Sequence, residues 1–141
     1  MIRLYAGLIV SILVSAPALG QVERLESVLA RGAKRLSGAE AKAALTGNVL
    51  VGPYHTGEIL TVYYNPDGSL AGTNHSTGAQ FQGDWSVDDR GLQCLSYWIP
   101  GWGGENICRL WFRLGDVLYV LESESDEDRS QFVYARTLNR R

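Results

Sequence analysis

Two histidines, His55 and His75, are the side chains best suited to proton transfer or metal binding in this sequence. Imidazole titrates near neutral pH and is a common metal ligand. The interval between them matches no metal-ligand spacing, and the chain contains neither a G-x-S-x-G nor an H-E-x-x-H motif. We therefore interpret both as solvated loop residues and expect a non-catalytic protein without metal or cofactor. Clustering of the two with a carboxylate would favour an enzyme instead.

An acidic run, residues 122–128, is the second group of chemically capable side chains. Its acidic members are Glu122, Glu124, Asp126, Glu127 and Asp128. Carboxylates suit Ca²⁺, but the run lacks the Asp-x-Asp-x-Asp-Gly frame of a calcium loop. We interpret it as a solvated loop between strands. The whole chain has 13 basic and 15 acidic residues, and this net charge of −2 argues against a nucleic-acid partner.

A tryptophan at the tip of a predicted hairpin, Trp102, is the strongest single candidate for a binding residue. It stands between glycines, and an exposed tryptophan there is typical of the rigid anchors that dominate binding interfaces. In the alternative interpretation, Trp102 folds over the core together with Trp98. Trp111 lies between two arginines that are suited to cation–π stacking or to holding an anionic ligand. The predicted binding residues are Tyr97, Trp102, Arg109, Trp111 and Arg113.

Residues 1–20 have the composition of a secretory signal peptide. A single arginine is followed by an uncharged apolar run over residues 4–14 and then by small residues. That run is shorter than the roughly 20 apolar residues that a membrane span requires. We expect cleavage after Ala18 or Gly20, no membrane span in the mature chain, and a location in the periplasm or outside the cell. The mature protein, residues 21–141, is predicted to be one domain.

Export determines how the two cysteines, Cys94 and Cys108, are interpreted. In an oxidising compartment two lone cysteines usually pair. A bridge around a loop of about 15 residues stabilises a fold by about 3 kcal/mol in the chain-entropy model. A thiolate nucleophile or a metal ligand is the alternative, and it would need a reducing compartment or further ligands. We predict a disulfide.

Helical periodicity is confined to the first part of the mature chain, residues 21–46. Apolar residues recur at three- and four-residue steps over residues 21–31, which indicates an amphipathic helix. Ser37 and Glu40 then form the pattern of a capping box. This predicts a second short helix that ends at Gly47.

The apolar periodicity changes to two over residues 47–138, which indicates strands. Turn residues such as Pro66-Asp67-Gly68 separate the strand segments. We predict eight strands, over residues 49–51, 58–65, 69–73, 79–87, 92–99, 107–114, 117–122 and 132–138. The expected fold class is mainly β (α+β): a small meandering antiparallel barrel or curled sheet with one or two short N-terminal helices.

The two strands of the predicted hairpin also yield a prediction about the core. Placing Cys94 opposite Cys108 divides their side chains between two faces. The face expected to form the core contains Leu92, Cys94, Trp98, Leu110, Phe112 and Leu114. The opposite face contains Tyr97, Arg109, Trp111 and Arg113.

Five short patterns occur in an order that resembles small exported bacterial proteins grouped as a domain of unknown function. They are Leu36–Glu40, Ala44–Asn48, Tyr64–Gly68, Gly83–Trp85 and the Cys94–Cys108 pair. The resemblance covers residues 36–119 and implies a periplasmic location, with no established activity. The Gly-x-Trp pattern is also similar to that of lipocalin-like barrels and periplasmic protease-inhibitor barrels. In lipocalins it lies near the start of the barrel, whereas here it lies in the middle.

These observations favour an exported binding module for a small molecule or an envelope component. The alternative is a proteinaceous inhibitor that inserts the Trp102 loop into an exported hydrolase. An apolar cavity with a few convergent polar groups would favour the first function. A solid core with Trp102 projecting from it would favour the second. The expected partner is therefore a small-molecule ligand or an exported protein.

Overall fold

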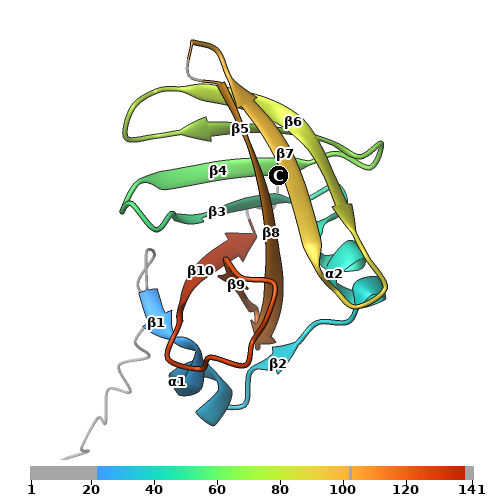
Figure 1. Cartoon of the computed structure of the whole chain (residues 1–141), viewed down its shortest axis with the longest axis vertical. Coiled ribbons are helices and arrows are strands. Elements are labelled where there is room, and N and C mark those ends of the chain that lie inside the picture. The colour runs from blue at the N-terminus through green and yellow to red at the C-terminus, as the bar shows by residue number, and fades with distance from the viewer. Residues whose placement is uncertain (1–21, 102, 139–141) are drawn as a thin grey trace, which may run out of the picture.

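A closed antiparallel β-barrel forms the body of the molecule (Figure 1). The computed structural model describes residues 22–101 and 103–138. The barrel strands are β3 (Val49–Pro53), β4 (Ile59–Tyr64), β5 (Ser69–Asn74), β6 (Gln80–Val87), β7 (Gln93–Ile99), β8 (Gly103–Leu114), β9 (Val117–Leu121) and β10 (Phe132–Leu138). Each strand pairs with the next along the chain, and β10 pairs with both β9 and β3, which closes the ring. The predicted mainly β fold with eight barrel strands is confirmed.

Short turns join the strands, and their residues explain where the chain reverses. In the turn between β4 and β5, Asp67 accepts hydrogen bonds from the backbone N–H (2.9 Å) and the hydroxyl (2.7 Å) of Ser69. Gly68 has a φ of 89°, a conformation that glycine adopts without steric cost. The predicted turn is therefore confirmed.

Two short strands and two helices precede the barrel. They are β1 (Val22–Arg24), α1 (Leu25–Ala30), β2 (Lys34–Arg35) and α2 (Gly38–Leu45). The helix predicted over residues 21–31 is shorter, because its first residues pair with the part of β10 that β3 does not reach. β2 extends the sheet in the same way alongside β8. Within the described residues, no helix is long and apolar enough to cross a membrane.

Helix α2 closes one end of the barrel. The Ser37 hydroxyl accepts from the Glu40 backbone N–H (3.2 Å), and Glu40 Oε1 accepts from the Ser37 backbone N–H (3.1 Å). The predicted capping box is thereby confirmed. Ala41 and Leu45 of this helix are fully buried in an apolar cluster inside the barrel. The large aromatic members of that cluster are Tyr64, Trp85 and Trp111.

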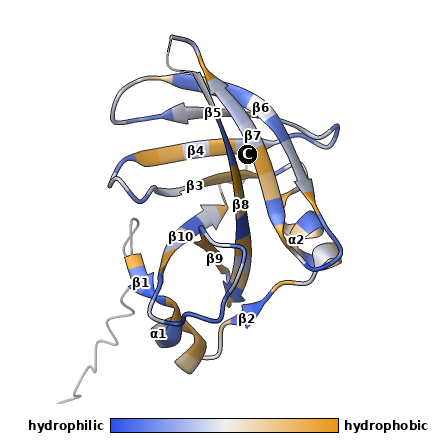
Figure 2. Cartoon of the chain, in the orientation of Figure 1, coloured by the Kyte–Doolittle hydropathy of each residue, from blue (hydrophilic) through white to orange (hydrophobic). Residues whose placement is uncertain are grey.

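A second apolar cluster lies outside the barrel wall, between α1 and strands β8, β9 and β10 (Figures 1 and 2). Leu25 and Val28 of α1 are fully buried there, in the same cluster as Leu110 and Phe112 of β8. Because α1 covers its outer face, β8 is buried on both sides in this region. We refer to this group of residues as the α1 cluster.

The double coverage of β8 corrects the predicted division of the hairpin faces. Leu110 and Phe112 are buried as predicted, but they face the α1 cluster and not the barrel interior. Trp111 and Arg109, predicted to lie on the face away from the core, are 1% and 5% exposed and point into the barrel. Trp98, predicted in the core, is 50% exposed, because α1 lies at the other end of the barrel (Figure 1).

The predicted disulfide is present. Cys94 and Cys108 stand directly opposite each other on β7 and β8, and their sulfur atoms are 2.02 Å apart. Both belong to the edge of the α1 cluster. The bridge therefore joins the two strands on the outer face of the barrel.

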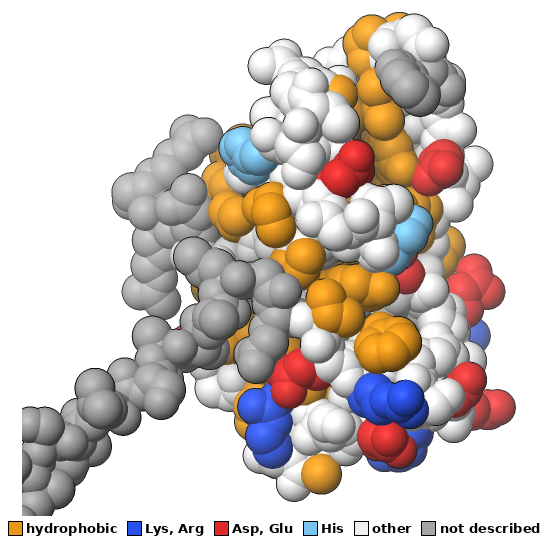
Figure 3. All heavy atoms as spheres, turned by 90° about the vertical axis from the view of Figure 1, so that its left-hand side faces the viewer, with side chains coloured by type: hydrophobic (Ala, Val, Ile, Leu, Met, Phe, Trp, Pro, Cys, Tyr) orange, Lys and Arg blue, Asp and Glu red, His pale blue; other side chains and the backbone are white. Residues whose placement is uncertain are grey.

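Charged side chains are unevenly distributed on the face shown in Figure 3. Lysine and arginine side chains gather toward the end of the molecule that carries α1, where Arg31 pairs with Glu23 (2.6 Å). Acidic side chains are visible at both ends of this face, and both histidines are visible in its other half. On this face, the described residues at that other end present no basic side chain.

Candidate functional site

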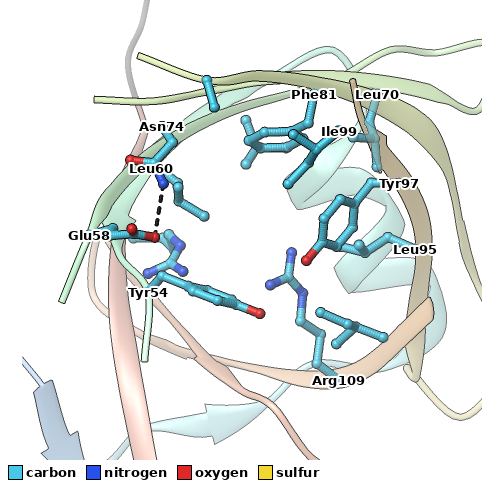
Figure 4. Close-up of a pocket in the computed structure, with 14 residues that line it drawn as sticks. Tyr54, Glu58, Leu60, Leu70, Asn74, Phe81, Leu95, Tyr97, Ile99 and Arg109 are labelled. Carbon is cyan, nitrogen blue, oxygen red and sulfur yellow. Dashed lines mark hydrogen bonds between the residues drawn. The ribbon is translucent and has the colours of Figure 1, made fainter. Parts of the chain in front are cut away.

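A cavity of about 100 Å³ lies inside the barrel, beyond the aromatic cluster that α2 covers (Figure 4). Most of its wall is apolar, because alternate side chains of each barrel strand point inward. The large apolar residues of the wall are Leu60, Val62, Leu70, Phe81, Leu95, Ile99 and Ile107. Residues from the segments 54–58 and 74–79 line the opposite end of the cavity from α2. We refer to this end as the mouth.

Polar side chains from several strands converge on the same cavity. They are Tyr54, Glu58, Asn74, Tyr97, Arg109 and Arg136. Figure 4 shows the hydroxyls of Tyr54 and Tyr97 and the guanidinium of Arg109 pointing toward one another across the cavity. The cavity therefore combines a mostly apolar wall with a small polar region that contains two arginines.

Arg109 is held against the cavity wall by several groups. Its Nε donates to Oε1 of Gln93 (2.9 Å), and its Nη2 donates to the hydroxyl of Tyr64 (2.8 Å). Its Nη1 lies 3.7 Å from Oε1 of Glu122. The guanidinium also lies 5.5 Å from the ring centroid of Trp111, which is the predicted cation–π contact. These contacts fix both the position and the orientation of the Arg109 guanidinium.

Arg136, on β10, is 3% exposed. Its Nη1 donates to the carbonyl oxygens of Pro53 and Ala135. Gly52 leaves room for it, because a Cβ at that position would lie 2.8 Å from Nη1 of Arg136. No carboxylate among the described residues lies within 4.0 Å of this guanidinium. Burial, together with the positive charge of Arg109, lowers the pKa of Arg136 to about 10.

Glu122 follows β9 directly and connects the cavity wall with the surface. Its Oε1 is buried near Arg109 and accepts no hydrogen bond from the described residues. Its Oε2 lies 3.0 Å from Nδ1 of His55, whose side chain is exposed. The prediction of a solvated acidic loop is therefore wrong for Glu122, while residues 124–128 lie mainly at the surface.

The mouth of the cavity carries hydroxyl and carboxylate groups. The Tyr97 hydroxyl donates to Oε2 of Glu105 (2.6 Å). Burial and then this hydrogen bond raise the pKa of Tyr97, and burial raises the pKa of Tyr54. Both hydroxyls therefore keep their protons at neutral pH. Glu58 accepts a hydrogen bond from Asn74 (2.8 Å), drawn as the dashed line in Figure 4.

The two histidines lie at the surface and contact different partners. His55 contacts Glu122, whereas Nε2 of His75 lies 2.6 Å from the hydroxyl of Thr61. In the part of the chain that the structure describes, no group of three or more His, Cys, Asp or Glu side chains is arranged to hold a metal ion. The histidines therefore do not combine into a metal site there.

The structure places the predicted binding residues in different surroundings. Tyr97 and Arg109 line the cavity. Trp111 does not line the cavity and is buried in the apolar cluster inside the barrel. Arg113 is exposed beside β2, outside the cavity. Trp102 lies outside the described residues. The structure thus brings together two of the five predicted residues.

Six polar residues in or beside the cavity are not among the predicted binding residues: Tyr54, Glu58, Asn74, Gln93, Glu122 and Arg136. Arg136 occupies the same alternate positions of β10 as Tyr134 and Leu138, which pack on the barrel cluster. That alternation was a usable signal. A charged residue in a strand is ordinarily assigned to the solvent face, however, and only closure of the barrel shows that this face points inward.

The chain was compared with protein-family models and with curated proteins. No family model matches it, and no curated protein matches it. Its function is therefore inferred from the cavity and the side chains around it.

Proposed function

We propose that the protein is an exported, non-catalytic binding module that holds a small molecule in the barrel cavity. The observation that carries this proposal is a mostly apolar wall with convergent polar groups. Ligand sites in proteins are usually concave and apolar, with a few polar groups that orient the ligand. Because α2 and the aromatic cluster fill the opposite end of the barrel, a ligand would enter through the mouth.

The size of the cavity limits what fits inside. Its volume of about 100 Å³ is smaller than the roughly 150 Å³ of an apolar cavity that accommodates benzene. The buried part of the ligand is therefore a small ring or a short alkyl segment. Any larger remainder of the ligand would lie at the mouth.

Export is part of the proposal. The composition of residues 1–20 supports a cleaved leader. The Cys94–Cys108 bridge is compatible with an oxidising compartment. We expect the exported chain to begin near residue 21, which the intact mass of protein from the periplasmic or extracellular fraction would test. An uncleaved chain in the cytoplasm would contradict this part of the proposal.

Inhibition of an exported hydrolase is the second candidate function. The observation that favours it is the half-exposed Trp98 near the tip of the β7–β8 hairpin, because exposed tryptophans are typical of binding interfaces. The hairpin residue Trp102 lies outside the described residues. An inhibitor that acts through a loop has no need of a cavity, so the cavity favours ligand binding.

A matched pair of variants on one strand tests cavity binding. Ile107 lines the cavity, whereas the neighbouring Asn106 is exposed on the outer face of β8. Ile107→Trp should fill the cavity, and Asn106→Trp should leave it open. Each protein is purified in mature form, its fold is checked by circular dichroism, and its co-purifying small molecules are identified by mass spectrometry.

The expected result is a small molecule bound to the native protein and to Asn106→Trp, and absent from folded Ile107→Trp. Retention of the same molecule by Ile107→Trp would contradict binding in the cavity. Capture of a hydrolase instead of a small molecule, abolished by substitution of Trp98, would favour the inhibitor function.

A further inference from the structure

The two arginines that line the cavity differ in their contacts with carboxylates. Arg109 and Arg136 both line it. Glu122 lies 3.7 Å from Arg109 and shares its other oxygen with His55. Arg136 has no carboxylate within 4.0 Å among the described residues. Glu58 also lines the cavity, but it is hydrogen-bonded to neighbours at the mouth (2.8 and 3.1 Å).

An unpaired guanidinium inside a barrel is unfavourable for the fold. Buried charges in proteins are normally paired, because moving a charged group out of water without a partner costs on the order of several kcal/mol. The pKa of Arg136 is lowered to about 10, so the side chain still carries its charge at neutral pH. The negative charge of Glu122 acts on this guanidinium, but no carboxylate of the described residues is in ion-pair contact with it. Destabilising groups of this kind are typical of sites that are built for a ligand.

The guanidinium of Arg136 has hydrogen-bond donors left for a ligand. Both of its hydrogen bonds within the described residues come from Nη1, although a guanidinium carries five N–H donors. Its planar fork matches the two oxygens of a carboxylate. The hydroxyl of Tyr54, which is hydrogen-bonded to that of Tyr97, lines the same cavity.

Building on the proposed function, we propose that the ligand is an organic monocarboxylate. Its carboxylate would pair with Arg136 beside Arg109, and its apolar part would lie against the wall that includes Phe81 and Leu95. A mostly apolar wall disfavours a strongly hydrated inorganic ion such as phosphate.

Pairs of charged and neutral ligands of the same shape test the inference. Isothermal titration calorimetry of the mature protein compares octanoate with 1-octanol, and benzoate with benzyl alcohol. We expect at least one acid to bind about tenfold or more tightly than its alcohol, as charge-assisted hydrogen bonds predict. Inorganic phosphate should not displace that acid.

Variants of Arg136 separate recognition from structure. Arg136→Met removes the charge but keeps an unbranched apolar chain. We expect the affinity for the acid to fall about tenfold or more, the affinity for the alcohol to stay the same, and Tm to stay the same or rise. A purely structural role would instead lower Tm and weaken the binding of both ligands equally.

Two further variants serve as comparisons. Arg136→Lys, which keeps the charge but loses the fork, should fold and bind the acid more weakly. Arg129→Met, at an exposed arginine, should change neither affinity.

The outcomes distinguish the inference from the proposed function. Equal affinity for acid and alcohol, unchanged by Arg136→Met, would overturn the carboxylate assignment and leave cavity binding intact. Displacement of the acid by phosphate would overturn the choice of an organic acid. Binding of none of the four organic ligands, together with no co-purifying small molecule, would overturn the proposed function and the inference with it.

Discussion

At the residue scale, one glutamine orients the polar part of the barrel interior. Gln93 is fully buried, and its Oε1 accepts hydrogen bonds from Nε of Arg109 (2.9 Å) and Nε1 of Trp111 (3.0 Å). Its own Nε2 has no partner among the described residues. The glutamine therefore fixes two large side chains while one of its own donors stays unsatisfied. Arg109 owes its position at the cavity wall in part to this residue.

Substitution of Gln93 should show how much the two hydrogen bonds to its Oε1 contribute to the free energy of unfolding. Gln93→Leu leaves two buried donors without an acceptor. At about 1–3 kcal/mol for each of the two unsatisfied groups, the free energy of unfolding should fall by about 2–6 kcal/mol. Gln93→Glu keeps the acceptor and adds a negative charge beside Arg109, so it should lose less. Urea denaturation followed by tryptophan fluorescence measures both. Equal losses in the two variants would show that packing, and not the hydrogen bonds, sets the cost.

The cavity residues differ in how far the sequence alone can identify them. Arg109 and Tyr97 are both among the predicted binding residues, although the register of the cysteine pair was interpreted to place them on the face away from the core. Arg136 lies far from that pair in the sequence. Its alternation with Tyr134 and Leu138 places it on one face of β10, but this pattern alone does not show that the face points inward. Its inward position depends on the pairing of β10 with both β9 and β3. Contacts of this long-range kind are set by the closed barrel and not by strand periodicity.

At the element scale, the N-terminal helices determine which strand faces are buried. Alternation and turn residues locate all eight barrel strands, because strands and turns are specified by local sequence. The assignment of the β8 faces fails because α1 adds a second apolar cluster on the outside of the barrel. Alternation alone gives a single buried face, and it does not reveal a helix that packs on the other one. The exposed Trp98 and the buried Trp111 are the direct consequences.

The α2 capping box gives the protein a predictable response to acid. Hydrogen bonds from the Ser37 backbone N–H and then from its side chain lower the pKa of Glu40 below its ordinary value of 4.5. A carboxyl with a lowered folded-state pKa stabilises the fold above its unfolded pKa, and this contribution is lost as the pH falls through the folded pKa. Glu40→Gln keeps an acceptor without the charge. The Tm of the native protein should therefore exceed that of Glu40→Gln near neutral pH, and the difference should shrink below pH 4.5.

Thermal denaturation followed by circular dichroism at a series of pH values measures this difference. Ser37→Ala serves as the companion variant, and it should lower the free energy of unfolding by about 1 kcal/mol at neutral pH through loss of the cap. A Tm difference between the native protein and Glu40→Gln that stays constant across the acidic range would contradict the assigned role of the carboxylate.

At the scale of the whole molecule, the barrel wall separates two apolar clusters with different surroundings. The inner cluster continues from the α2 end toward the cavity, whereas the α1 cluster lies outside β8, β9 and β10. Closure of the ring leaves no free edge among the eight barrel strands. The outer cluster can therefore stabilise the barrel without occupying the interior. A cavity inside the barrel is therefore compatible with a stable fold. The α1 cluster supplies apolar packing on the outer side of the wall, where the cavity takes none away.

Two leucine truncations test this separation. Leu25 is fully buried in the α1 cluster, and Leu95 belongs to the cavity wall. Leu25→Ala and Leu95→Ala remove the same atoms, and a buried leucine-to-alanine change costs about 2–5 kcal/mol of unfolding free energy. We expect Leu25→Ala to be destabilised by that amount with unchanged affinity for the acid that binds the native protein. Leu95→Ala should lose stability and also alter the affinity, because it reshapes the surface that the ligand contacts.

Urea denaturation measures the stability of each variant, and calorimetry measures its affinity for the acid. An equal loss of affinity in Leu25→Ala would mean that the wall transmits packing changes from the α1 cluster to the cavity, so that the two clusters act as one unit.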